Sequence, residues 1–547
     1  MTRRVSAKPS LRQGLAWSAV SALVLRLGTL AVGIFLARLL SPEQFGVYAI
    51  ALTVQAVLMT LADFGLSTDL IRSRDHERKA PTVATLGLVT GTSLALIMVW
   101  SAQGTAELLG SPDAGPVIAV MSLTLVFAGA GVVPFASLQR NFEQKKLFVA
   151  NLADFIVGTV LTVLLILAGW GVMALAISRV IAQLTSMTLQ FVLSGERPRF
   201  GFNRSLVPQV LTFGLPVAGA NLLSWVLLSS DKVIISHLAG PAALGFYFLA
   251  FNISNWPMSA IGQVVRAVAL PAFSRSGAPR DRILADAVAP TWTFTLLAGL
   301  LLALLASPVI EIVYGEKWLD AAPILIILGL FGALRTLFDM AVAFLLARGH
   351  SGAVLVVQVA WLSALIPALY LGTRMDGGVG AATGHFAVAL VVVAPAYCWA
   401  LARAGASLRL LWASVWPPMA AALPTAAAVL VVMEIVDGPL PRLLVGGTAG
   451  TAVYLLVIGS WVRRRLAIAS RLGEPAGLPG GTPAETASPD TGTPDQAPST
   501  VQEPVLDPPQ ASAATRFSAR RAASRRKRAV GDLSEESSDA APVRTAL

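Results

Sequence analysis

The stretch ARLLSPEQFGVYAIALTV, residues 37–54, aligns without gaps with a second stretch, SHLAGPAALGFYFLAFNI, residues 236–253. In this alignment the identical pairs are Pro42 with Pro241, Gly46 with Gly245, Tyr48 with Tyr247 and Ala51 with Ala250. Proline, glycine and tyrosine match as well as aliphatic residues, so the similarity exceeds what two Ala/Leu-rich helices share by composition. The pattern predicts that the chain contains an internal repeat.

The composition around these stretches is typical of a membrane protein. Of 547 residues, 55% are hydrophobic and only 13% are charged, which is more apolar surface than one soluble core can bury. The formal net charge of +11 fits lysine and arginine in cytoplasmic loops better than nucleic-acid binding. The single cysteine, Cys398, excludes an internal disulfide and a thiolate metal site.

Apolar runs recur along the chain, and each is long enough to cross a hydrocarbon core of about 30 Å as a helix. Barrel strands are excluded because the runs are too long. The fold class predicted is an all-α polytopic membrane protein with about fourteen spans. Their approximate limits are 14–36, 44–66, 82–104, 115–138, 147–169, 171–193, 210–236, 241–263, 284–307, 321–347, 352–372, 378–402, 411–433 and 440–461.

Lysine and arginine alternate with these spans. The connections that share a side with the N-terminus carry nearly all of them, roughly five to one over the opposite side. Examples are Arg3, Arg74, Lys145 and Arg280, whereas the opposite side has only Arg38, Lys317, Arg374 and Arg442. This distribution predicts that both termini are cytoplasmic.

The repeat divides the first twelve spans into two sets of six. An even number of spans returns the chain to its starting side, so the two halves run parallel around a central cleft. We therefore expect an N-terminal lobe at 1–200, a C-terminal lobe at 201–405 and two additional helices at 406–471. The remainder, 472–547, is rich in Pro, Gly, Thr and Ser and predicts a disordered cytoplasmic tail. The tail's basic cluster, which includes Arg520 and Arg528, is either a solvated segment or a tether to anionic lipid.

No motif for catalysis, nucleotide binding or metal binding is present in the sequence, so we expect neither an enzyme nor a cofactor. The informative residues are the ionisable ones inside the spans, because each costs at least about 2.5 kcal/mol at mid-membrane unless it faces protein or water. Arg26 lies about 18 Å into the first span. Arg335 and Asp339 are one turn apart in the tenth span, where they lock two helices together or contact substrate.

Four further residues complete this set. Asp154 in the fifth span and Arg179 in the sixth lie at different expected depths, which leaves a direct ion pair open. Asp231 and Lys232 are about a hundred degrees apart on the seventh span, so we expect them to face different neighbours, one of them in the cleft. For Lys232 the other reading is an ammonium that reaches the outer interface.

Three segments together resemble one known family: FLARLLSPEQFGVYAIALTV at 35–54, ASLQRNFEQKKLF at 136–148 and SSDKVIISHLAGPAALGFYFLAFNI at 229–253. They look like the polysaccharide-transporter branch, with its Wzx-type flippases, of the multidrug/oligosaccharidyl-lipid/polysaccharide exporter superfamily. Asp231 and Gly245-Phe246-Tyr247 match the family's aspartate and glycine-tyrosine pattern. The resemblance implies two six-helix lobes whose cleft opens alternately to each side of the bacterial cytoplasmic membrane.

The resemblance also implies a substrate, namely an oligosaccharide linked to a polyprenyl diphosphate, with polymerase and glycosyltransferase machinery as candidate partners. A forked guanidinium binds phosphate oxygens bidentately, so a cationic lining suits this lipid. The candidates are Arg26, Arg179, Lys232 and Arg335 for phosphate, and Asp154, Asp231 and Asp339 as coupling-ion or structural carboxylates.

Three alternatives stay open at this point. A drug or metabolite antiporter of the same superfamily would use Asp154 or Asp339 to couple transport to protons or sodium. A membrane enzyme would need a large external loop with acid/base residues, and the predicted loops are short. A scaffold for a synthesis complex would not explain the buried charges.

Overall fold

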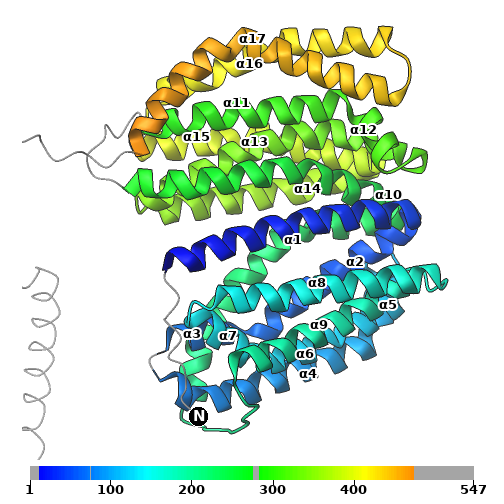
Figure 1. Cartoon of the computed structure of the whole chain (residues 1–547), viewed down its shortest axis with the longest axis vertical. Coiled ribbons are helices and arrows are strands. Elements are labelled where there is room, and N and C mark those ends of the chain that lie inside the picture. The colour runs from blue at the N-terminus through cyan, green and yellow to red at the C-terminus, as the bar shows by residue number, and fades with distance from the viewer. Residues whose placement is uncertain (1–10, 74, 275–282, 474–547) are drawn as a thin grey trace, which may run out of the picture. The chain divides into compact units, whose positions relative to one another are not determined.

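All regular elements in the described part of the chain are helices, and the computed structural model describes residues 11–73, 75–274 and 283–473 (Figure 1). These helices belong to one compact unit, Met1–Ala476. The predicted all-α polytopic fold is confirmed. The predicted tail and the loops at Arg74 and Arg280 lie outside the described residues.

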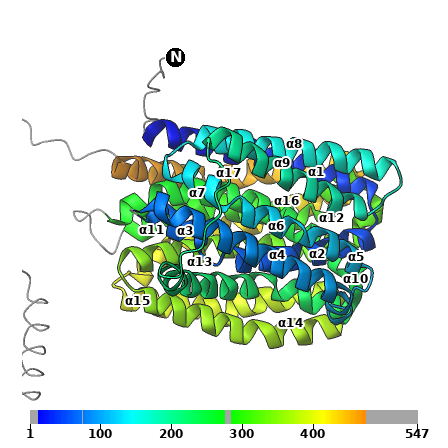
Figure 2. The same ribbon diagram turned by 90° about the horizontal axis from the view of Figure 1, so that it is seen from below.

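The first nine helices contain the predicted N-terminal half, and α1, α8 and α9 lie side by side in it (Figures 1 and 2). The helices are α1 (Leu11–Leu39), α2 (Pro42–Asp63), α3 (Leu66–Arg72), α4 (His76–Leu108), α5 (Ala114–Ser122), α6 (Thr124–Ala130), α7 (Val132–Arg140), α8 (Gln144–Leu167) and α9 (Met173–Ser194). The expected straight span at 115–138 is instead broken into α5, α6 and α7. The segments Ala114–Ala130 and Val132–Arg140 meet at a bend of 51°.

The remaining elements contain two long helices that are interrupted. They are α10 (Val207–Ser274), α11 (Ile283–Leu304), α12 (Ala306–Val313), the 3₁₀ helix η1 (Glu316–Ala321), α13 (Ala322–Ala347), α14 (Ser351–Val388), the π-helical turn η2 (Ala389–Val393), α15 (Ala394–Arg403), α16 (Leu408–Ile435) and α17 (Pro439–Gly473). Figure 1 shows α16 and α17 packed on the side of α11, which both contact.

The breaks in α10 and α14 are hairpin turns between spans. In α10 the break is Gly240, whose φ of 84° lies in a region that only glycine adopts readily. In α14 the break is at Asp376 and Gly377. A Cβ on Gly372 would lie 2.2 Å from the carbonyl oxygen of Gly380, so the chain runs back along itself there.

Ten helical segments among the described residues are long and apolar enough to cross a membrane, and the bent pair makes an eleventh if it acts as one span. One of the ten, Ser351–Arg403, has 53 residues and includes the turn at Gly377. At 1.5 Å per residue it is more than twice the length that a core of about 30 Å requires. The total of fourteen spans stays a prediction.

The SPEQFG turn begins α2 because Ser41 and Gln44 cap each other. The Gln44 backbone N–H donates to Ser41 Oγ at 3.2 Å, and the Ser41 N–H donates to Gln44 Oε1 at 3.1 Å. Pro42 fits the first helical position, where no N–H is needed. This capping box fixes where the first connection ends and the second span begins.

The two repeated stretches contact each other directly. A Cβ on Gly46 would lie 1.8 Å from the Pro241 carbonyl oxygen, and a Cβ on Gly245 would lie 2.0 Å from the Pro42 carbonyl oxygen. The residues that approach each other are thus the pairs aligned in the sequence, with the partners exchanged. A two-fold relation between the segments requires such a reciprocal contact. The lobe boundaries at 200 and 405 stay predictions.

The end of α1 is joined to α12 and η1 by what we call the α1–η1 latch, formed by Arg38, Lys317 and Trp318. Lys317 Nζ donates to the carbonyl oxygens of Arg38 at 2.8 Å and Leu40 at 2.7 Å. Trp318 Nε1 donates to the Ala37 carbonyl at 2.8 Å. In return, the Arg38 guanidinium donates to the last carbonyls of α12. Cations are stabilised at helix C-termini. Lys317 therefore stabilises the C-terminal end of α1, and Arg38 stabilises the C-terminal end of α12.

Candidate functional site

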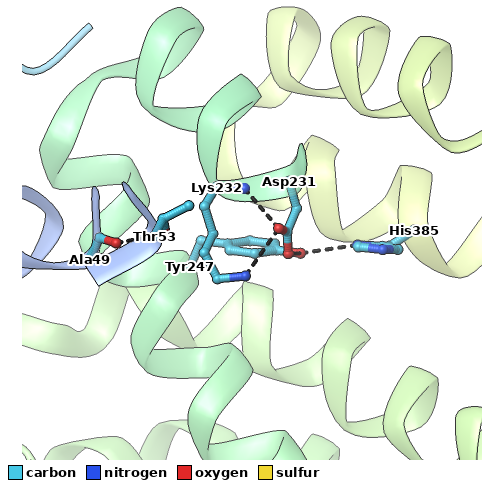
Figure 3. A network of polar contacts seen from close by, with 6 residues as sticks. All are labelled: Ala49, Thr53, Asp231, Lys232, Tyr247 and His385. Atoms are coloured by element: carbon cyan, nitrogen blue, oxygen red, sulfur yellow. Dashed lines mark hydrogen bonds and ion pairs between the residues drawn. The ribbon is translucent and has the colours of Figure 1, made fainter. Parts of the chain in front are cut away.

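A buried polar network connects the two helical arms of α10 with α14 (Figure 3). Tyr247 donates its hydroxyl hydrogen to Asp231 Oδ2 at 3.2 Å, and its oxygen lies 3.0 Å from Nδ1 of His385. Lys232 Nζ lies 3.2 Å from Asp231 Oδ1 and 5.1 Å from the centre of the Phe251 ring. Within this network the Asp231 carboxylate contacts both a cation and a hydroxyl donor.

Asp231 contacts Tyr247 and borders a cavity whereas Lys232 lies over Phe251, as expected for different neighbours, but the two side chains also pair with each other, which was not expected. The four-carbon stem of Lys232 bends back, so its ammonium reaches the carboxylate of the preceding residue. The same carboxylate oxygen also accepts the Lys232 backbone N–H at 2.8 Å. The side chains are 12% and 3% exposed, so a charge on either one without the other would be costly. Adjacent position on a helix therefore did not prevent pairing.

His385 is the residue of this network that the sequence reasoning missed. It is buried, its ring stacks on Phe331 with centroids 5.0 Å apart, and it lies in the twelfth predicted span. The sequence did contain a signal for His385. It is an ionisable residue inside an apolar run, and the arginines and aspartates were selected by the same criterion. Tyr247 was visible only as part of the repeat.

Asp231 and His385 border a cavity of about 530 Å³ that we call the aromatic cavity. Arg335 and Asp339 line it too, so the structure brings together three of the predicted residues here. Arg335 and Asp339 do not pair with each other within the part of the chain that the structure describes. Much of the wall is aromatic, from residues that include Phe251, Phe331, Phe338, Trp361 and Tyr397.

A second cavity, of about 590 Å³, is lined from both predicted halves, and we call it the central cavity. Side chains of α1, α2, α8 and α9 form one wall, while Phe248, Asn252 and Trp256 of α10 face them. The lining mixes aromatic rings with amides and hydroxyls. Its polar and aromatic members include Thr29, Tyr48, Asn151, Thr159, Thr162, Ser178, Asn252, Trp256 and Tyr314.

Arg179 and Asp154 form an ion pair in the wall of the central cavity. Arg179 Nη1 lies 3.0 Å from Asp154 Oδ2, and the side chains are 38% and 19% exposed. The bridge that the sequence left open is therefore present. Both residues also line a third cavity, of about 390 Å³, which we call the polar cavity.

Arg26 is half-buried on α1, next to the central cavity. Thr29, Leu30 and Gly33 line that cavity and follow Arg26 by three, four and seven residues, so all four lie on one helix face. Gly28 packs α1 against α8, since a Cβ there would lie 2.6 Å from the Phe155 ring. Arg26 thus lies within the stretch of α1 that lines the cavity, next to the lining residue Leu25, without being a lining residue itself.

The four predicted cations do not share one cavity. Arg179 and Arg26 are at or beside the central cavity, whereas Arg335 lines the aromatic cavity and Lys232 is paired behind it. Each half therefore has its own polar centre. Tyr48 and Tyr247, aligned in the repeat, take part in the two centres respectively.

Sequence comparisons agree with this architecture. The profile of the family described as "Polysaccharide biosynthesis protein" matches residues 35–323, more than half of the chain. The succinoglycan biosynthesis transport protein ExoT of Rhizobium meliloti (strain 1021) is 28% identical over 498 residues, covering 88% of this chain and 99% of ExoT. The lipopolysaccharide biosynthesis protein WzxC of Escherichia coli (strain K12) is 24% identical, covering 75% of this chain and 85% of WzxC.

Solved structures show the same fold. The lipid II flippase MurJ in an inward closed conformation matches with a TM-score of 0.65 at 16% identity, over 83% of this chain and all of MurJ. An inward-facing multidrug resistance MATE family transporter of the MOP superfamily matches with a TM-score of 0.54 at 17% identity, over 72% of this chain and 98% of that one. The chain is a bacterial membrane protein that belongs to the polysaccharide biosynthesis protein family, which confirms the resemblance indicated by its sequence motifs.

Proposed function

We propose that the protein flips a lipid-diphosphate-linked oligosaccharide from the inner to the outer leaflet of the bacterial cytoplasmic membrane. The two halves expose the central cavity alternately to each side, and both termini remain in the cytoplasm. The protein acts as a transporter without chemical conversion of its substrate. The polyprenyl tail stays in lipid while the diphosphate and sugars cross through the cavity.

The observation that carries this proposal is the composition of the central cavity. Amides and hydroxyls such as Asn151, Asn252 and Thr162 suit the hydroxyl groups of sugars, and Trp256 offers a flat ring for a sugar face. Arg179 supplies the guanidinium that a diphosphate requires. At about 590 Å³ the cavity is within the range of about 300–1,000 Å³ typical of ligand sites.

The other predicted residues have supporting roles in this proposal. Arg26, next to a residue of the cavity lining, meets the diphosphate as it enters from the inner side. Lys232 and Asp231 neutralise each other in the C-terminal half, so we assign that pair to the coupling of helix movement rather than to a free phosphate site. Arg335 and Asp339 line the aromatic cavity, whose rings suit the flat face of a sugar.

The names of relatives support the substrate class. ExoT is described as a succinoglycan biosynthesis transport protein, and TuaB of Bacillus subtilis (strain 168), at 24% identity, as a teichuronic acid biosynthesis protein. Relatives named for such different glycans are consistent with recognition of a part other than the sugars, and we assign that part to the lipid diphosphate. Polymerase and glycosyltransferase machinery would then be the neighbours that deliver and consume the substrate.

Deletion of the gene tests this function in the native host. We expect surface glycan to disappear and lipid-linked oligosaccharide to accumulate where an impermeant oxidant such as periodate cannot reach it in intact spheroplasts. Arg179→Gln should reproduce this defect at a normal membrane level. Arg197→Gln is the matched control, since Arg197 is exposed just beyond the end of α9. Accumulated substrate that periodate does reach in the deletion strain would place the defect after flipping and contradict the proposal.

A further inference from the structure

The Asp154–Arg179 ion pair separates two cavities. Asn151, Asp154 and Arg179 line the central cavity on one side and the polar cavity on the other. The pair is thus accessible from both spaces while its atoms hold each other at 3.0 Å. A ligand that enters the central cavity and a proton that enters the polar cavity would meet at the same two side chains.

The Asp154 carboxylate is only half satisfied. Oδ2 accepts a hydrogen bond from Arg179, but Oδ1 is buried and has no hydrogen-bond partner among the described residues. Among the described residues, Arg179 is therefore the group that stabilises this carboxylate. If Arg179 turned to another anion, Asp154 would be left without a cationic partner between the two cavities.

The polar cavity offers Asp154 a route for protons. Gln183, Ser186 and Gln190 line it from α9, at positions that continue the helix face of Arg179. Asp63 and Ser67 line it from the opposite side, near the end of α2 that we expect at the cytoplasm. Its volume of about 390 Å³ and its amide and hydroxyl groups suit a file of water molecules.

Among the described residues, the titratable groups that line the two cavities together with the pair are Tyr48 and Asp63 on α2 and Tyr314 after α12. Arg26 on α1 and Arg140 on α7 lie elsewhere on helices that contribute to the lining. Arg140 donates to the Ser73 carbonyl at 2.7 Å, and Asp63 accepts from the Ser67 hydroxyl at 3.0 Å. Of these groups, Arg179 is the cation in direct contact with Asp154.

We propose that substrate phosphate displaces Asp154 from Arg179 and that Asp154 then takes up one proton through the polar cavity. The carboxylate and the incoming proton form one O–H bond, and no other bond forms or breaks. When the phosphate leaves, Arg179 returns and the proton is released. This inference rests on the proposed function, because a lipid diphosphate is the anion that competes for the guanidinium.

The purified full-length protein and farnesyl diphospho-glucose test the exchange, since this diester has no titrating proton of its own near neutral pH. For the wild type, Kd should rise with pH, by up to about tenfold per pH unit where one proton is bound with the ligand. Asp154→Asn should bind with a pH-independent Kd. Glu107→Gln, which changes an exposed carboxylate of α4 that lines neither cavity, should keep the wild-type slope.

A second measurement uses only the wild type and so does not depend on how the variants fold. With a pH-indicator dye in weak buffer, each bound farnesyl diphospho-glucose should remove about one proton from solution. Binding without proton uptake, or equal pH slopes for wild type and Asp154→Asn, would overturn the exchange but leave the proposed function standing. No saturable binding of the probe to the wild type would instead overturn the proposed function, and the exchange with it.

Discussion

Inside the membrane, individual charged residues are held by partners that the chain itself provides. Lys232 satisfies Asp231 and Arg179 satisfies Asp154, so each half contains a neutral pair rather than a bare charge. Arg26 has no such partner among the described residues and lies beside the central cavity. Because the sequence predicts a central depth for it, we expect Arg26 to depend on a ligand or water for its stability.

Replacement of Arg26 should therefore damage transport more than folding. We expect Arg26→Ala to reach the membrane at a near-normal level and yet support little surface glycan. Arg26→Lys should recover only part of the activity, because an ammonium lacks the fork that binds two phosphate oxygens. Surface glycan and membrane level, both measured by quantitative blotting, check this.

Two results would contradict a phosphate-binding role for Arg26. Normal transport by Arg26→Ala would exclude the phosphate role. The phosphate role would also be excluded if Arg26→Ala were lost from the membrane while Arg26→Gln had both a normal level and normal activity. A neutral side chain would then suffice for packing.

The sequence predicted which charged residues lie at or beside the cavities better than it predicted how they are arranged. The positions of Arg26, Arg179 and Asp231 inside apolar runs identified these residues from the sequence alone. It did not reveal that Lys232 folds back onto its neighbour, because helix periodicity gives directions of Cβ atoms and not of long flexible side chains. The contact between Tyr247 and His385 joins residues far apart in the chain, so no local pattern predicts it.

Among the helices, the crossing of α2 with α10 determines how the halves meet. Gly46 and Gly245 allow the two backbones to approach within contact distance, and Trp318 packs against Phe45 and Phe246 nearby, with ring centroids 5.3 and 5.9 Å apart. The α1–η1 latch closes the same region by hydrogen bonds to helix ends. Small residues and polar bonds replace the hydrophobic effect, which is weak between helices in lipid.

Gly46→Ala should force α2 and α10 apart, because its Cβ would overlap the Pro241 carbonyl oxygen at 1.8 Å. We expect a loss of stability at or above the upper end of the about 1–3 kcal/mol that overpacking typically costs. Gly104→Ala on α4 is the matched control, since nothing lies within 4 Å of its Cβ. Thermal unfolding in detergent compares the two. Equal melting temperatures for both variants would show that the crossing is not tight.

Lys317→Ala should weaken the latch and favour the state that is open to the outside. A cysteine at Ser178, in the central cavity, should then react faster with an impermeant reagent added to intact cells, in a Cys398→Ser background. Arg374→Ala is the control, because this arginine stacks on Tyr370 instead of bridging the halves. Unchanged labelling in Lys317→Ala would show that the latch does not govern access.

At the scale of the whole molecule, hydrophobicity predicted the all-α polytopic fold, and residues matched in the repeat proved to be the ones that meet where α2 crosses α10. What the lengths of the apolar runs did not show were the bends. The run at 115–138 is long enough for one span, yet the chain bends by 51° between Ala130 and Val132. Pro134 follows the bend and has no N–H to donate to the Ala130 carbonyl, so the sequence did contain a local cause, and α5, α6 and α7 then pack against α4 and α9.

The predicted orientation requires opposite labelling of the two ends of α8. A cysteine at Lys145 should be protected from an impermeant maleimide in intact cells and become reactive after permeabilisation, since this end is predicted to be cytoplasmic. A cysteine at Trp170, in the exposed connection between α8 and α9, should react in intact cells. The reverse pattern would invert the topology.

An assay with the purified protein in vesicles tests most directly whether it moves lipid-linked oligosaccharide between the leaflets. Lipid-linked oligosaccharide from a strain that lacks the protein is placed in both leaflets of sealed vesicles, and impermeant periodate oxidises the outer-leaflet pool. With wild-type protein nearly all of the lipid-linked sugar should become oxidised, whereas vesicles with no protein or with Arg179→Gln should retain the inner-leaflet pool. The proposed flipping would be contradicted if vesicles with folded wild-type protein retained that pool under an imposed pH gradient of either sign.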